Sequence, residues 1–196
     1  MLSAVDRFHG KKKEVRSDFG DIKDRGKIVT DVSTSDSAAR RLERFPPFLK
    51  LGIRVVELHA EWRQVRILLP LSADNRNPGG TMFGGSIASL ADPIPALACH
   101  RQFPEHAVWT RHLEIDFRRP GATDLELRFE LSEAAISAIG QELSDRGRST
   151  PCFEFGLYDA QDKLVAWVKN RVAIRPRERD VAPLGAMSGR PQVDKE

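Results

Sequence analysis

Residues 77–93 read Asn-Pro-Gly-Gly-Thr-Met-Phe-Gly-Gly-Ser-Ile-Ala-Ser-Leu-Ala-Asp-Pro, and this stretch decides how the chain is interpreted. Asn77 is followed by a flexible turn and then by the paired glycines Gly84 and Gly85. From Phe83 onward, apolar residues recur at helical spacing, and Asp92 lies two turns inside this small, apolar run. The arrangement can place backbone N–H donors and a carboxylate around one reacting carbonyl, so acyl transfer is the leading hypothesis.

The predicted helix, 83–101, contains two prolines near its middle. Pro93 and Pro95 both lack a backbone N–H, so we expect the helix to kink or restart here. Asp followed by Pro is also a common pair at the start of a helix, where the Asp caps free N–H groups. Asp92 therefore has two interpretations: a cap alone, or a cap that also takes part in catalysis or ligand contact.

Alternation of apolar and polar residues predicts strands on both sides of this helix. The expected strands are 53–59, 65–69, 110–118, 125–131, 153–157 and 164–174. Two more helices are expected, one over 37–45 that Pro46 and Pro47 stop, and one over 134–146 that ends at Gly147. Hairpin-like connections dominate, so we predict an α+β fold in which a curved antiparallel sheet wraps around the central helix.

The strand expected over 110–118 has two distinct faces. Leu113 and Ile115 share the apolar face, whereas His112 falls on the other. The same alternation places Thr110, at the start of the strand, on the polar side with His112.

Length and composition fit one soluble domain with tails. We predict a flexible N-terminal extension over 1–35, a folded domain over 36–175 and a flexible C-terminal tail over 176–196. The net charge of the 196 residues is only +3, and the charges of both signs are interleaved. Because no basic stripe with interleaved aromatics is present, nucleic acid is not the expected partner.

The two cysteines bear on the compartment. Cys99 and Cys152 match no metal or redox spacing, so we expect buried free thiols in a reducing compartment and no metal site. The first residues lack the continuous apolar core of a signal peptide, and no run approaches the roughly 20 apolar residues that span a bilayer. We therefore expect a cytoplasmic protein without a membrane span.

Several motifs resemble those of known families. Asn77-x-x-Gly80-Thr81-x-x-Gly84-Gly85, followed by Leu90-Ala91-Asp92, is similar to the signature of hotdog-fold acyl-CoA thioesterases of the phenylacetate-pathway type. The runs 80–86, 91–93, 108–109 and 117–121 resemble DUF4442, a hotdog-like family whose members are commonly labelled thioesterases. The resemblance covers roughly residues 38–175 and implies the hotdog fold.

The resemblance also implies roles for single residues. Asn77 would help to position the thioester or the attacking water, and the N–H of Gly84 or Gly85 would bind the thioester oxygen. Asp92 would act as nucleophile or general base, and Thr110 would help to hold water. The chain departs from the family pattern at Phe83, where the usual residue before the paired glycines is a histidine.

Each of these residues also has an ordinary structural interpretation. Glycines permit tight turns and close packing, and Asn77 suits a turn before proline. Arg118 and Arg119, near a predicted strand end, can meet the phosphates of coenzyme A or simply keep the surface soluble.

Two functions from different classes therefore stay open. The first is hydrolysis of an acyl-CoA thioester, with coenzyme A as part of the substrate and no other cofactor. The second is a non-catalytic module that binds an acyl group or acyl-CoA, which Phe83 and the proline-broken helix favour. A hotdog dehydratase is a distant third, because the chain shows no acid–histidine pair. A single unit leaves a sheet edge open, so we expect a homodimer or a dimer of dimers, with Gly84 and Gly85 of one subunit facing Asp92 of the other.

Overall fold

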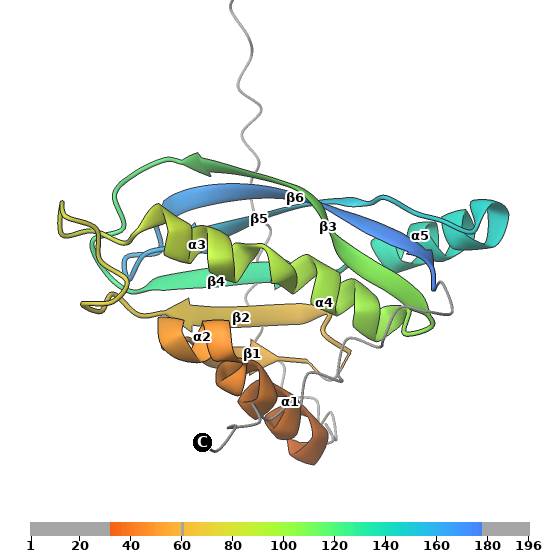
Figure 1. Cartoon of the computed structure of the whole chain (residues 1–196), viewed down its shortest axis with the longest axis horizontal. Coiled ribbons are helices and arrows are strands. Elements are labelled where there is room, and N and C mark those ends of the chain that lie inside the picture. The colour runs from red at the N-terminus through yellow and green to blue at the C-terminus, as the bar shows by residue number, and fades with distance from the viewer. Residues whose placement is uncertain (1–31, 60, 178–196) are drawn as a thin grey trace, which may run out of the picture. The chain divides into compact units, whose positions relative to one another are not determined.

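The computed structural model describes residues 32–59 and 61–177, and it contains one antiparallel sheet (Figure 1). The six strands follow the order β1-β2-β4-β5-β6-β3, and all neighbours run antiparallel. They are β1 Arg54–Leu58, β2 Gln64–Leu69, β3 His106–Phe117, β4 Leu125–Glu130, β5 Cys152–Tyr158 and β6 Leu164–Pro176. The antiparallel sheet expected from the sequence is thus confirmed, while most of both predicted tails lies outside the described residues.

Five helices accompany the strands in this part of the chain. They are α1 Val32–Arg44, α2 Pro46–Leu51, α3 Gly84–Ala91, α4 Pro93–Gln102 and α5 Glu133–Arg146. α1 begins four residues before the predicted start of the domain at residue 36. Pro46 and Pro47 end α1 as expected, but they also begin α2, because proline fits the first turn of a helix, where the N–H has no partner.

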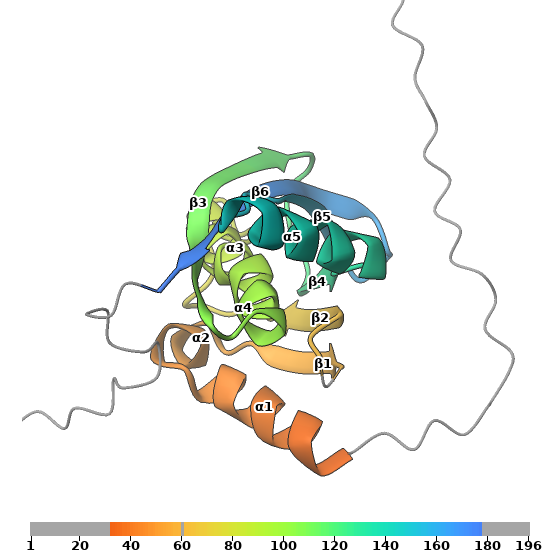
Figure 2. The same cartoon turned by 90° about the vertical axis from the view of Figure 1, so that its right-hand side faces the viewer.

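The central helix is buried against the sheet. Figure 2 shows the sheet curving around α3 and α4. Ile87, Leu90 and Ile94 are almost fully buried, and they meet the inner face of the sheet, which includes Ile67 and Leu127. The apolar spacing along 83–101 therefore reports the side of the helix that is packed against the strands.

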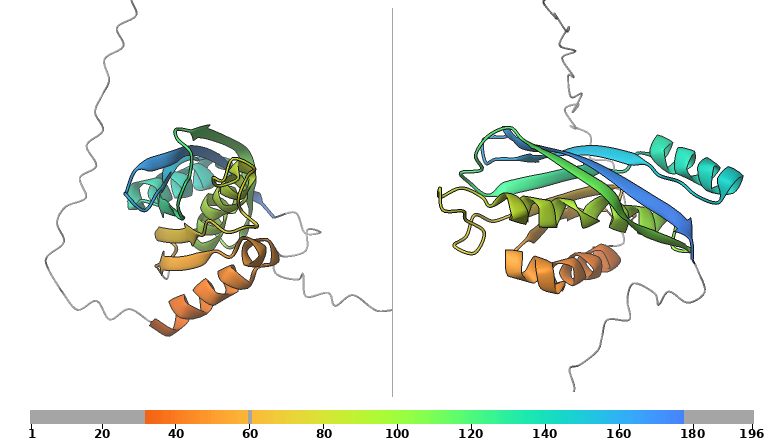
Figure 3. Two further views of the ribbon diagram at one scale, coloured as in Figure 1. Left: turned by 90° about the vertical axis from the view of Figure 1, so that its left-hand side faces the viewer. Right: turned by 45° about the horizontal axis from the view of Figure 1, so that its top comes forward.

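α5 is placed by signals that the sequence carries at both of its ends. The hydroxyl of Ser132 accepts a hydrogen bond from the N–H of Ala135, and Gly147 ends the helix with a φ of 63°. Ile139 is the buried residue of this helix. Figure 3 shows α5 at one end of the sheet, away from α3.

The two edges of the sheet differ. α1 lies beside β1, and the Glu43 carboxylate accepts a hydrogen bond of 2.8 Å from the N–H of Val55 in β1 (Figure 2). At the other edge, β3 pairs with β6, and among the described residues no strand pairs with its outer side. β3 is therefore the edge at which backbone groups are open to another strand.

A β-bulge in β3 changes the side on which one predicted site residue lies. The pairing of β3 with β6 shifts register between Thr110 and His112, so Arg111 is the extra residue. Val108 and Thr110 consequently face the helix together with Leu113, although simple alternation predicted Thr110 on the polar side with His112. That prediction is wrong because alternation breaks at a bulge.

The two cysteines are free but lie in different environments. Cys99 is buried in α4 as predicted, and burial raises the pKa of its thiol to about 12. Cys152 is exposed, so its predicted burial is wrong. It precedes Phe153, whose side chain faces the core, and alternation turns Cys152 outward.

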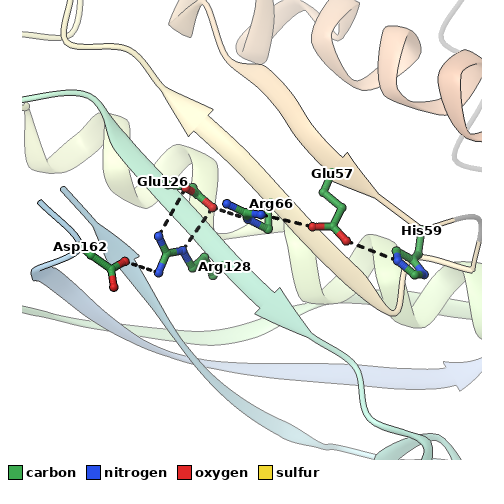
Figure 4. A network of polar contacts seen from close by, with 6 residues as sticks. All are labelled: Glu57, His59, Arg66, Glu126, Arg128 and Asp162. Carbon is green, nitrogen blue, oxygen red and sulfur yellow. Dashed lines mark hydrogen bonds and ion pairs between the residues drawn. The ribbon is translucent and has the colours of Figure 1, made fainter. Parts of the chain in front are cut away.

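Charged residues cross the outer face of the sheet in one connected network (Figure 4). Glu126 of β4 accepts hydrogen bonds from Arg66 of β2 and Arg128 of β4, and Arg128 also pairs with Asp162. Arg66 extends the network to Glu57, which lies 3.4 Å from His59. Burial raises the pKa of Glu126, but the hydrogen bonds and charges of Arg66 and Arg128 outweigh it, so the pKa is lowered.

We expect Glu126→Gln to lower the free energy of unfolding by about 1 kcal/mol at pH 7, because the neutral amide loses both charged partners. Since the pKa of Glu126 is lower in the folded chain than in the unfolded one, its contribution is complete above roughly pH 5. It is lost as the pH falls through the folded pKa.

Urea unfolding at several pH values measures this difference. Glu130→Gln is the matched control, because Glu130 lies at the exposed end of the same strand and has no ion pair among the described residues. An equal loss of stability in both variants, or a Glu126→Gln effect that persists at pH 3, would contradict the prediction.

Candidate active site

The loop before α3 is held by Asn77. Its side-chain amide donates to the Thr81 hydroxyl at 2.9 Å, and its carbonyl oxygen accepts from the N–H of Thr81 at 3.2 Å. Gly80 adopts a φ of 80°, a left-handed conformation that glycine takes without strain. Asn77 therefore shapes the loop, and its contact with a substrate stays a prediction.

Within the part of the chain that the structure describes, the first two N–H groups of α3 have no hydrogen-bond acceptor. The Phe83 N–H donates to the carbonyl of Asn75 at 2.7 Å, which fixes the chain just before the helix. Phe83 has an extended backbone, and its carbonyl accepts from the N–H groups of Ser86 and Ile87. Gly84 and Gly85 are thus the first two residues of the helix, where N–H groups have no acceptor within the helix and carry partial positive charge.

Two aromatic rings lie on the paired glycines. A Cβ atom at Gly85 would collide with the ring of Phe83, and a Cβ atom at Gly84 would lie 3.1 Å from Cζ of Phe117. Phe83 and Phe117 are 56% and 54% exposed, so both rings also face solvent. A side chain at either glycine would force the ring of Phe83 or Phe117 to move, so glycine leaves both rings in place.

Asp92 lies at the break between the two helices. α3 ends at Ala91, and α4 begins at Pro93, as the prolines predicted. The Asp92 side chain makes no capping hydrogen bond to α4 among the described residues, so the cap that both interpretations assumed is wrong, and a part in catalysis or ligand contact stays a prediction. Its half-buried carboxylate therefore does not cap the helix.

The carbonyl groups at this break accept hydrogen bonds from side chains of the sheet. Pro95 has no N–H for the carbonyl of Ala91, four residues earlier. The side-chain amide of Asn170 in β6 donates to the Asp92 carbonyl at 2.8 Å and to the Ala91 carbonyl at 3.4 Å. The Thr110 hydroxyl in β3 also donates to the Asp92 carbonyl, at 2.8 Å. These two side chains fix the backbone that carries the Asp92 carboxylate.

Asn170 is therefore a residue of the site that the sequence interpretation missed. It is completely buried in the apolar final strand. A single amide in such a strand, together with two prolines in the helix that packs on the sheet, is the signal that could have revealed it. Thr110 is confirmed as a neighbour of Asp92, but its hydroxyl is bonded to the main chain, and its role in holding water stays a prediction.

Asn170→Ala is expected to destabilise the fold by about 2 kcal/mol, because the Ala91 carbonyl loses its side-chain donor and the Asp92 carbonyl keeps only the Thr110 hydroxyl. Thr110→Val removes one of the two donors to the Asp92 carbonyl and is expected to cost about 1 kcal/mol. Chemical unfolding measures both values. Thr110→Ser keeps the hydroxyl and serves as the control; if it lost as much stability as Thr110→Val, the hydrogen bond would not be the cause.

The two halves of the candidate site are separated within one chain. Asp92 follows Gly85 by two turns of helix, which is about 10 Å at 1.5 Å per residue. A single carbonyl therefore cannot touch both the Gly85 N–H and the carboxylate of the same chain. Both halves nevertheless lie along β3, since Phe117 contacts Gly84 and Thr110 contacts Asp92.

Arg118 and Arg119 follow Phe117 at the end of β3. Both are exposed, and their N–H groups donate to the carbonyl of Val165. Arg118 forms an ion pair of 2.7 Å with Asp116. The predicted arginine pair thus directly follows in the chain the residue whose ring lies on Gly84.

A groove opens on the other side of the helix start, between α2 and α3. Its volume is about 690 Å³, which lies within the range of small-molecule sites. It is lined by Leu49, Lys50, Leu51, Asp74, Asn75, Phe83, Gly85, Ser86 and Ser89. The sequence did not reveal this groove, because its two walls are far apart in the chain.

Solved structures with a similar arrangement include three proteins from bacteria. A protein of unknown function from Pseudomonas aeruginosa, described as a probable thioesterase, is 24% identical, with a TM-score of 0.66 over 72% of this chain and 95% of that chain. The PaaI protein of the phenylacetic acid degradation operon of E. coli is 22% identical, with a TM-score of 0.53 over 70% of this chain and 89% of that chain. A thioesterase from Haemophilus influenzae is 14% identical, with a TM-score of 0.59 over 76% of this chain and 95% of that chain.

These likenesses show that the chain has the hotdog fold expected from its sequence. None of the curated proteins matches the chain. Among the described residues, no helix is long and apolar enough to span a membrane. The model of the family described as "Domain of unknown function (DUF4442)" matches residues 37–174, and the chain therefore belongs to this family.

Proposed function

We propose that the protein hydrolyses an acyl-CoA thioester as a homodimer, with each site built from both subunits. One observation carries the proposal: among the described residues, helix-start N–H groups and a carboxylate that have no hydrogen-bond partner both lie along β3, the edge strand whose outer side is unpaired. The fold shared with proteins described as thioesterases supports it.

The homodimer follows from the positions of the two halves. Antiparallel pairing of two β3 strands about a two-fold axis brings the Phe117 end of one strand beside the Thr110 region of the other. Gly84 contacts Phe117, and Asp92 is bonded to Thr110, so this pairing brings the helix start of one subunit towards the partner's Asp92. The gap of about 10 Å within one chain is thereby closed between chains.

The proposed chemistry divides between these groups. The partner's Asp92 carboxylate takes a proton from a water molecule, whose oxygen attacks the thioester carbonyl carbon. The oxygen that becomes negative accepts hydrogen bonds from the N–H of Gly84 or Gly85. The carbon–sulfur bond then breaks, the carbonyl reforms, and Asp92 returns the proton to the leaving thiolate. Asn77 supports the loop that holds the donors, and Thr110 supports the backbone of Asp92.

Coenzyme A enters as part of the substrate in this proposal. Arg118 and Arg119 are exposed beside Phe117, next to Gly84, and guanidinium groups bind phosphates through several donors at once. We therefore assign the phosphates of coenzyme A to this side of the helix start. No other cofactor is needed for the hydrolysis.

A second candidate function is binding of an acyl group without hydrolysis. The observation that favours it is the ring of Phe83, which lies on Gly85 and narrows the approach to its N–H. A module of this kind would bind acyl-CoA and release no thiol.

Release of free thiol from a panel of acyl-CoA substrates, measured with the purified full chain, tests the proposal. Hydrolysis is expected for at least one acyl class, together with a rise in melting temperature when a non-hydrolysable thioether analogue is added. Stabilisation by the analogue without turnover of any substrate would favour the binding function over the enzymatic one. Absence of both turnover and stabilisation would contradict both candidate functions.

A further inference from the structure

The groove between α2 and α3 presents an apolar surface beside the proposed reaction centre. Leu49 and Phe83 line it from opposite elements, and they are 64% and 56% exposed. Two large exposed apolar side chains that line one concave surface form a place where an apolar partner can bind. The groove reaches Gly85, whose N–H is one of the two candidate oxyanion donors.

The uncharged polar side chains of the groove are already hydrogen-bonded within the chain. The Asn75 amide donates to the carbonyls of Leu51 and Pro70 at 2.7 Å and 3.1 Å, and its oxygen lies 3.4 Å from the Ser86 hydroxyl. The Ser89 hydroxyl donates to the carbonyl of Gly85 at 2.8 Å. A bound molecule would therefore find few free hydrogen-bonding groups in this surface. This favours an apolar occupant, because a polar one would lose its hydrogen bonds to water.

The charges at the groove also favour a neutral occupant. Lys50 and Asp74 are the two ionisable residues that line it, and both are exposed. They have opposite signs, so together they attract neither an anionic nor a cationic group strongly.

A thioester has two arms, the acyl group and coenzyme A, and the start of α3 lies between the two surfaces proposed for them. The Phe117 ring lies on Gly84, and Arg118 and Arg119, to which the phosphates of coenzyme A are assigned, directly follow Phe117 in the chain. Phe83 and the groove lie on the Gly85 side. A thioester whose carbonyl oxygen sits at the glycines can thus extend its two arms in different directions.

We propose that the groove between α2 and α3 binds the acyl group of the substrate, and that this group is an uncharged, apolar chain held between Leu49 and Phe83. The inference rests on the proposed function and adds the substrate class. α2, which lies upstream of the whole sheet, then selects the substrate through Leu49.

Calorimetric titration of the full chain with thioether analogues of acyl-CoA, from acetyl to decanoyl, tests the proposal. Each added methylene is expected to tighten binding by about three-fold until the groove is filled. Phe83→Ala and Leu49→Ala should each weaken octanoyl binding by about ten-fold and acetyl binding by less than two-fold. Both residues are largely exposed, so their truncation leaves the core intact.

Phe117→Ala is the matched control, because Phe117 is 54% exposed and its ring lies on the other glycine, outside the groove. It should weaken the binding of short and long analogues alike. The proposal is overturned if wild-type binding does not depend on chain length, or if Phe83→Ala and Leu49→Ala keep the wild-type octanoyl-to-acetyl ratio. In those cases the proposed hydrolysis can still hold, whereas absence of both binding and turnover for every chain would overturn the proposed function and this inference together.

Discussion

Asp92→Asn is expected to lower kcat for acyl-CoA hydrolysis by about 10³-fold and to leave the stability of the fold almost unchanged. The amide cannot take the proton from water, so the step that the carboxylate assists is lost. The fold is expected to survive because the Asp92 side chain makes no capping bond among the described residues. The backbone at this position is held through its carbonyl by Thr110 and Asn170, and the substitution keeps that carbonyl.

Steady-state thiol release and chemical unfolding of the same preparation separate these two effects. KM should change little, since the carboxylate acts in the transition state rather than in substrate binding. Asp145→Asn is the control, because Asp145 lies on α5, away from both halves of the site, and pairs with Gln141. A variant Asp92→Asn that keeps more than a tenth of the wild-type kcat would remove Asp92 from the mechanism.

Mixing two inactive variants is expected to restore about a quarter of the wild-type activity, provided that each site uses both subunits. One variant is Asp92→Asn, and the other is the double variant Gly84→Pro/Gly85→Ala. Proline suits the first helical position but carries no N–H, and the extended backbone of Phe83 is compatible with a following proline. A methyl group at Gly85 meets the ring of Phe83, so it crowds the place where the carbonyl must arrive.

The quarter follows from random exchange of subunits. About half of the dimers then contain one subunit of each kind, and each mixed dimer has one of its two sites intact. Native mass spectrometry confirms that mixed dimers have formed before the activity is read. Mixed dimers without activity would show that the two halves act within one chain or that one of them plays no part, and a monomer at micromolar concentration would remove the shared site altogether.

The fold could be predicted from the sequence because its main signals are local. Prolines and glycines mark the helix ends, the apolar spacing over 83–101 marks the buried face, and alternation marks the strands. Predictions that assumed an unbroken pattern, or that rested on residue type alone, were wrong at two positions. The bulge at Arg111 turned Thr110 towards the helix, and the outward position of Cys152 could not be distinguished from a buried one by its residue type alone.

The site was predicted in part because some of its residues lie on one continuous stretch. Asn77, Gly84, Gly85 and Asp92 belong to the loop and helix that the motif covers, so their placement followed from the motif. Asn170 lies 78 residues from Asp92, and no local pattern indicates that its amide donates to the Asp92 carbonyl and to the Ala91 carbonyl, for which Pro95 has no N–H. The same holds for the ring of Phe117, which meets Gly84 from β3.

The hydrogen bond from Val55 to Glu43 has a consequence for assembly. A sheet with two bare edges can add copies at both ends and grow into a filament. Here α1 lies beside β1, so in the proposed dimer the copies join at β3. A pair joined there has a guarded β1 at each outer end, and sheet growth stops at two chains. We therefore expect α1 to prevent the addition of strands at β1, so that the open edge of β3 leads to a dimer and not to a filament.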